Sequence, residues 1–111
     1  MITHIVLLQP RADLTDDERR AALDTLSRAV VGVPEIRSVR LGQRVKHGLP
    51  GYEQRMAQDY DVALIIEVDD LAALTRYLRA PAHRALGNLF SSATDAALAY
   101  DYDMSEIVSS V

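Results

Sequence analysis

DLAALTRYLRAPAHRALGNLF, residues 70–90, is the stretch that decides how this chain folds. Its first half predicts an amphipathic helix that Asp70 caps and that turns Leu71, Leu74 and Leu78 inward at spacings of three and four residues. On the flank of that stripe, Ala73 and Tyr77 are stacked one turn apart. Residues 70–79 are therefore predicted to form one helix.

Pro81 interrupts this helix. A proline disfavours helical geometry at the preceding residue, Ala80, but suits the first turn of a new helix, so we expect a kink and a second helix from Pro81. That helix turns Ala82, Leu86, Leu89 and Phe90 inward. His83 is one step from the stripe, at the border between core and solvent, where the mouth of a pocket would lie.

The segments around this stretch alternate between strand and helix patterns. Thr15 and Glu18 form a T-x-x-E capping box, which predicts a helix with Ala22, Leu26, Ala29 and Val30 inward, supported by Leu23. Strands are predicted at residues 2–9, with His4, Val6 and Leu8 on one face, and at 35–46, 60–68 and 95–104. The order β-α-β-β-α-(α)-β predicts an α+β fold, the βαββαβ ferredoxin-like sandwich with helices on one face of the sheet.

Composition excludes several function classes. The 111 residues suffice for one domain, and a net charge of −4 argues against nucleic-acid binding. Cysteine is absent, which removes thiolate chemistry and fits a cytoplasmic protein. The opening MITHIVLL has no basic leader, and its apolar run is much shorter than the ~20 residues of a membrane span, so neither export nor membrane insertion is expected.

Two further features concern covered surfaces: a sheet face that the helices leave open, and a loop that could cover a pocket. In YDVALIIEV, residues 60–68, one face is wholly apolar and the other is mixed, and helices on one side of a sheet leave that second face open. The loop at 47–59 is long, and its Tyr52 or Met56 would reach over a pocket.

Several segments together resemble one family across nearly the whole chain. They are MITHIVLLQPRADLTDDE, VVGVPEIRSVRLGQ, YDVALIIEVDDLAALTRYLRAPAHRAL and AYDYDM, and the resemblance is to the stress-responsive A/B-barrel (Dabb) family. It implies that residues 1–104 form a ferredoxin-like protomer, with a short tail at 105–111. It also implies a homodimer in which two open sheet faces close into an α/β barrel.

The resemblance extends to a cofactor-independent enzyme of this family, a plant polyketide cyclase of the olivetolic acid type, which closes a poly-β-keto thioester by aldol condensation. Its catalytic tyrosine and histidine match Tyr77 and His83, and a pocket histidine matches His4. Two positions depart from the pattern: Leu26 stands where a pocket tyrosine is expected, and Ala80 replaces the histidine that usually precedes the proline. The substrate therefore need not be an alkylated polyketide.

The chemistry of these residue types agrees with that implication. Aldol-type closure needs a base and a donor that holds the enolate oxygen, and an imidazole and a tyrosine hydroxyl suit these tasks. A positioned base contributes on the order of 10² to 10⁴ in rate. We expect no metal, because no helical ligand spacing occurs near His83. The substrate-binding residues predicted with this pair line a small apolar pocket: His4, Val6, Leu8, Leu23, Leu26, Leu64, Ile66, Leu86 and Phe90.

Two alternatives to catalysis stay open. Tyr77 and His83 would serve structure alone if they bonded to one another and secured the kink, leaving a protein that binds small apolar or carbonyl ligands without turnover, or a stress-protective dimer. A solvent-reachable cavity that contains both side chains favours an enzyme. Filling of that space by Leu64, Leu86 and Phe90 favours a structural pair.

Overall fold

The computed structural model describes residues 1–51 and 57–108. Its elements follow the predicted order, and the predicted cover residues Tyr52 and Met56 lie outside the described residues. In chain order the elements are β1 (Ile2–Pro10), α1 (Asp16–Val30), β2 (Ile36–Gln43), β3 (Val62–Val68), α2 (Leu71–Arg79), α3 (Pro81–Ala93) and β4 (Thr94–Asp103).

Local capping chemistry fixes where the helices begin. The Thr15 hydroxyl accepts from the Glu18 amide while the Glu18 carboxylate accepts from the Thr15 amide, so the predicted capping box is present. The Asp70 carboxylate accepts from the Ala73 amide at the start of α2. Ala80 is extended, with φ −70° and ψ 148°, and Pro81 begins α3. The predicted kink is therefore confirmed.

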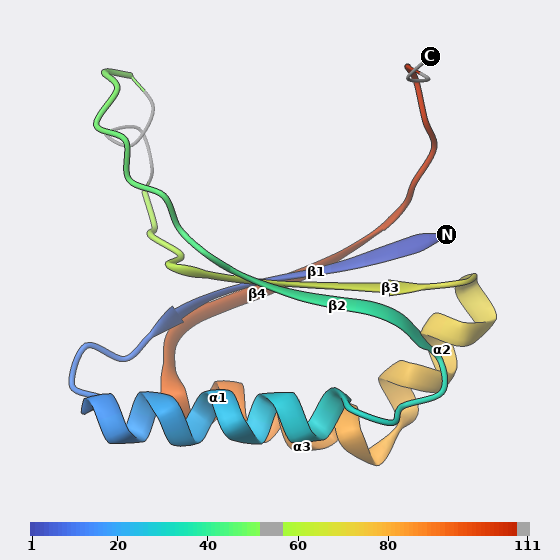
Figure 1. The fold of residues 1–111 in the computed structure, drawn as a ribbon, viewed down its shortest axis with the longest axis horizontal. Helices are drawn as coiled ribbons and strands as arrows, with labels where there is room; N and C mark the ends of the chain where they lie inside the picture. The colour runs from blue at the N-terminus through green and yellow to red at the C-terminus, as the bar shows by residue number, and fades with distance from the viewer. Residues whose placement is uncertain (52–56, 109–111) are drawn as a thin grey trace.

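The four strands form one antiparallel sheet in the order β2-β3-β1-β4. All three helices lie on the same face of this sheet, and the opposite face carries no helix among the described residues (Figure 1). The predicted ferredoxin-like sandwich is thus confirmed. In the register of the sheet His4 stands between Ile66 of β3 and Asp101 of β4, so all three side chains point toward the helices.

The core fills the layer between helices and sheet. Leu64, Ile66 and Val68 of β3 are fully buried there, because β3 is a central strand and alternate residues face the helices. The other buried apolar residues come from β1, β3 and each helix: Val6, Leu8, Leu26, Val30, Val62, Ala73, Leu74, Tyr77 and Leu86.

The inward face of α2 differs from the predicted one. Ala73, Leu74 and Tyr77 are buried, whereas Leu71 is 67% exposed and Leu78 is 38% exposed. Both sets have helical spacing, so periodicity does not distinguish them. Only Asp69 and Asp70 connect β3 to α2, and this short connection restricts how the helix can rotate over the sheet. The result brings the Tyr77 ring, rather than Leu78, into the core.

The uncovered sheet face is mostly apolar along its two middle strands and β4, with the cross-strand pair of Thr3 and Glu67 as polar residues near one end. Ile5, Leu7 and Ile65 are half-buried on it, and Tyr100 and Tyr102 of β4 are exposed. The segment after β2 and the C-terminal segment both extend away from the sheet on the side opposite the helices (Figure 1). An apolar face of this kind marks an interaction surface. Within the described residues, no helix has the length and apolar character needed to cross a bilayer.

We expect the chain to self-associate through this face. Sedimentation of the parent should give about twice the 12.3 kDa chain mass. Ile65→Glu places a charge at the centre of the face and should shift the protein to monomer, because an unpaired buried carboxylate disfavours association. Leu71→Glu is the matched control, since Leu71 is exposed on the helix side. A monomeric parent at micromolar concentration, or dissociation by the control variant, would contradict this prediction.

Candidate functional site

His4 is held by a short hydrogen bond under the helix layer. Its ring is 4% exposed, and Nδ1 lies 2.6 Å from Oδ1 of Asp101 across the β1–β4 ladder. A carboxylate only accepts, so Nδ1–H donates to Asp101, and this contact fixes the ring orientation and leaves Nε2 for a further contact. Asp101 also supplies a negative charge that balances the ring when it is protonated.

His83 faces His4 from the first turn of α3. Its amide donates to the Ala80 carbonyl at 3.1 Å, so the position of the residue follows directly from the kink. Burial lowers the pKa of His83 below its ordinary value, and the neighbouring His4 charge lowers it further. A backbone hydrogen bond at Leu78 and the Asp101 carboxylate act on this pKa in the opposite direction. The net effect favours a neutral imidazole, the form that accepts a proton.

Tyr77 packs against both imidazoles. Its ring centroid is 5.8 Å from that of His4 and 5.2 Å from that of His83, in each case edge to face with an interplanar angle of 75°. The tyrosine is 1% exposed, and burial, assisted by the Asp101 charge, raises its pKa to about 12. The phenol therefore stays protonated at neutral pH, and its ring restricts how either imidazole can turn.

A cavity of 200 Å³ opens beside the two histidines. Its walls come from β1, α3 and β4: His4, Val6, His83, Gly87, Phe90, Ala97, Leu98 and Ala99. The structure thus brings the three predicted polar residues together, with ring centroids within 6.1 Å of one another, but only His4 and His83 of the three line the cavity. Tyr77 lies behind them.

The residues predicted to bind substrate divide into three groups. His4, Val6 and Phe90 line the histidine cavity. Leu8, Leu23, Leu26 and again Phe90 line a separate cavity of 330 Å³ beside α1. Leu64, Ile66 and Leu86 line neither cavity and are at most 2% exposed, since they pack in the core between sheet and helices. The single apolar pocket expected from the sequence is therefore two cavities in the structure.

Sequence reasoning did not single out Asp101 or Gly87. The alternation of β4 places Asp101 on the same face as Ala97 and Ala99, but Asp95 and Asp103 share that alternation, so the pattern alone does not single out Asp101. Its pairing with His4 depends on strand register, which the pattern of a single strand does not give. Gly87 lies on α3, and a Cβ there would meet no atom within 4 Å.

The site places a proton acceptor, His83, and an imidazole that is hydrogen-bonded to a carboxylate, His4, on one small cavity. Within residues 1–51 and 57–108, no group of three or more His, Asp or Glu side chains is placed to hold a metal ion. The groups that can act on a bound molecule are the imidazoles, which transfer protons and donate or accept hydrogen bonds.

A sequence profile of the Stress responsive A/B Barrel Domain (Dabb) matches residues 2–104. The chain belongs to the Dabb family. No curated protein matches it in sequence. Several solved structures share the fold of this Dabb chain, and three of them represent the range.

The hydroxynitrile lyase from Passiflora edulis has a TM-score of 0.80 at 17% identity, with 97% of this chain and 96% of the lyase covered. A Dabb family protein from Mesorhizobium loti has a TM-score of 0.75 at 19% identity, with 95% of this chain and 97% of that protein covered. A dimeric protein of unknown function from Bacteroides fragilis has a TM-score of 0.67 at 23% identity, with 93% of this chain and 95% of that protein covered. At these identities the likeness shows the fold alone.

Substitution of Gly87 tests, without a substrate, whether small molecules reach His83 through the histidine cavity. Carbethoxylation by diethyl pyrocarbonate, followed residue by residue by mass spectrometry, reports on accessible neutral imidazoles. Gly87→Leu should fill the histidine cavity and slow modification of His83 severalfold. Gly87→Ala is the matched control: it should leave the rate nearly unchanged and stabilise α3 by about 0.5–1 kcal/mol, because glycine is a poor helix former. Equal rates in the leucine variant and the parent would show that reagent does not reach His83 through this cavity.

Proposed function

We propose that this Dabb protein is a homodimeric, cofactor-independent lyase or cyclase that makes or breaks a carbon–carbon bond beside a small carbonyl group. The observation that carries the proposal is the shared cavity of His4 and His83, in which one imidazole is favoured as neutral and the other is backed by a carboxylate. The cavity therefore offers a proton acceptor, His83, beside a hydrogen-bond donor, His4, as acid–base chemistry on a carbonyl compound requires.

His83 is the general base. In the bond-forming direction its neutral imidazole removes a proton from the carbon next to a carbonyl, and the resulting carbanion attacks a second carbonyl carbon. The new alkoxide then takes up a proton. In the reverse direction His83 removes the hydroxyl proton, the carbon–carbon bond breaks, and the departing carbon takes up a proton. Such a base typically contributes on the order of 10² to 10⁴ in rate.

His4 stabilises the charge that develops on oxygen. When the ring is protonated, Nδ1–H remains bonded to Asp101 and Nε2–H is left to donate to the substrate oxygen. The sequence prediction made Tyr77 the orienting residue or oxyanion donor, and His4 a wall of the pocket. Because Tyr77 is 1% exposed and lines neither cavity, the geometry favours His4 as the donor and Tyr77 as the residue that holds both rings in place.

The size of the cavity limits the substrate. A volume of 200 Å³ is below the range of about 300–1,000 Å³ typical of drug-sized ligand sites. Small ketones, aldehydes and hydroxynitriles suit this volume better than a long polyketide chain, and the substitutions Leu26 and Ala80 agree with that choice. The Passiflora edulis neighbour supports the lyase class, since it is by name a hydroxynitrile lyase on the same fold.

The proposal is tested by a ligand screen followed by kinetics on three variants. Small ketones, aldehydes, hydroxynitriles, phenols and β-keto thioesters are first screened by thermal shift, and stabilising compounds are assayed for turnover. His83→Gln should lower kcat by about 10²- to 10⁴-fold, because glutamine retains polarity but accepts no proton at neutral pH. Arg84→Gln, the exposed neighbour on α3, is the control and should keep the parent rate.

Tyr77→Phe tests whether Tyr77 only holds the two imidazole rings in place or also donates a hydrogen bond to the substrate oxygen. If the hydroxyl only stands behind the rings, the variant should stay within about fivefold of the parent in kcat. A loss matching that of His83→Gln would restore Tyr77 as the donor. A ligand that binds and is never turned over, or parent-like turnover by a folded His83→Gln protein, would contradict the enzymatic assignment and leave small-molecule binding as the function.

A further inference from the structure

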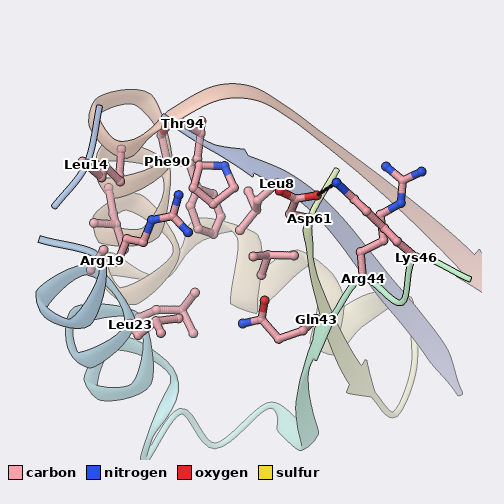
Figure 2. A pocket seen from close by; sticks show the side chains of 16 residues that line it. Leu8, Leu14, Arg19, Leu23, Gln43, Arg44, Lys46, Asp61, Phe90 and Thr94 are labelled. Atoms are coloured by element: carbon pink, nitrogen blue, oxygen red, sulfur yellow. Dashed lines mark hydrogen bonds and ion pairs between the residues drawn. The ribbon is translucent and has the colours of Figure 1, made fainter. Parts of the chain in front are cut away.

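The second cavity is larger than the histidine cavity and lies toward the other end of the helix layer. Its 330 Å³ are enclosed by α1, the C-terminal half of α3, and strand ends at Leu8, Gln43 and Val62 (Figure 2). Among the described residues, Phe90 alone lines both cavities. This cavity is therefore a separate compartment, and binding of a ligand in it is independent of the function proposed for His83.

The body of this cavity is apolar. Leu8, Leu26 and Val62 are buried core residues that border open space here, with Phe90 and Leu89 from α3. Exposed residues such as Arg19 and Lys46 stand at its mouth, so solvent and small molecules can enter the cavity. The volume also falls within the usual range for ligand sites.

The rim of the cavity is cationic in a protein with a net charge of −4. Two of its three cations have carboxylates nearby: Arg44 pairs with Asp59, and Lys46 Nζ lies 3.8 Å from Oδ1 of Asp61. Arg19 differs, because no carboxylate of the described residues lies within ion-pair distance of its guanidinium. Figure 2 shows the Arg19 side chain extending from α1 toward Phe90, on the wall opposite Asp61.

Asp61 completes the polar lining on the strand side. Its Oδ2 accepts from the Gln9 side chain at 3.2 Å, while the buried Oδ1 has no hydrogen-bond partner among the described residues. On this wall the carboxylates of Asp59 and Asp61 offset the charges of Arg44 and Lys46, whereas no carboxylate of the described residues offsets Arg19 on the opposite wall. The two walls of the cavity thus differ in charge, and the wall formed by α1 is the one that attracts an anion.

We propose that the 330 Å³ cavity binds a small amphipathic carboxylate. The apolar body of the ligand lies against Leu8, Leu26 and Val62, and its carboxylate pairs with the Arg19 guanidinium, whose planar fork matches a carboxylate in two parallel hydrogen bonds. The site would accept a medium-length acyl chain or a compact ring of similar size.

Octanoate and 1-octanol test this proposal because they share a chain and differ in head-group charge. By titration calorimetry on the full-length protein, the parent should bind octanoate more tightly than octanol. Arg19→Gln should weaken octanoate binding about tenfold and leave octanol binding unchanged, since only the charged partner is lost. Arg20→Gln is the matched control: it removes the same charge one residue away, from a side chain that does not line the cavity.

Two more variants locate the site. Ala22→Phe fills the cavity from α1 and should abolish binding of both probes, and circular dichroism checks that the variant is folded. His83→Gln should leave octanoate affinity unchanged, because His83 lines only the other cavity. The proposal is overturned if octanoate fails to bind, if Arg19→Gln and Arg20→Gln behave alike, or if a folded Ala22→Phe protein still binds octanoate.

Discussion

The break at Ala80 and Pro81 is the constraint on which the site depends. Proline supplies no amide proton and disfavours helical geometry before it, so the chain leaves α2 in an extended conformation and starts α3 at once. Tyr77 therefore lies in the last turn of α2 while His83 lies in the first turn of α3, and the centroids of the two rings are 5.2 Å apart. A continuous helix would have kept the side chains at positions 77 and 83 on one regular cylinder, six residues apart.

The sheet supplies the other half of the arrangement. His4 is between β3 and β4, and the register of β4 brings Asp101 to its Nδ1. The carboxylate and the Tyr77 ring hold His4 on two sides, and His4 lines the cavity together with His83. Helix break and strand register together give two imidazoles in different electrostatic settings, and this difference underlies the proposed division into acid and base.

Much of the fold follows from local signals in the sequence. The Thr15 and Glu18 box, the Asp70 cap and Pro81 each place a helix start through chemistry within four residues, and the alternation from Val62 to Val68 defines a buried strand. The predicted inward face of α2 was wrong, since Leu71 and Leu78 are as periodic as Ala73 and Tyr77 and only tertiary packing selects between them. The partnership of His4 with Asp101 is set by register across 97 residues of sequence separation. The division of one expected pocket into two depends on tertiary packing, which no local pattern specifies.

The proposed chemistry requires that His4 and His83 face one cavity in unequal electrostatic settings. Long-range ¹H–¹⁵N NMR of the imidazoles between pH 5 and 8 measures this difference, because the nitrogen shifts report both protonation and tautomer. Since burial and the His4 charge lower the pKa of His83, less than half of its rings should be protonated at pH 6.5, while the neutral form of His4 should carry its proton on Nδ1. A His83 that is half-protonated at or above pH 6.5, or a His4 with its proton on Nε2, would rule out the proposed division of roles.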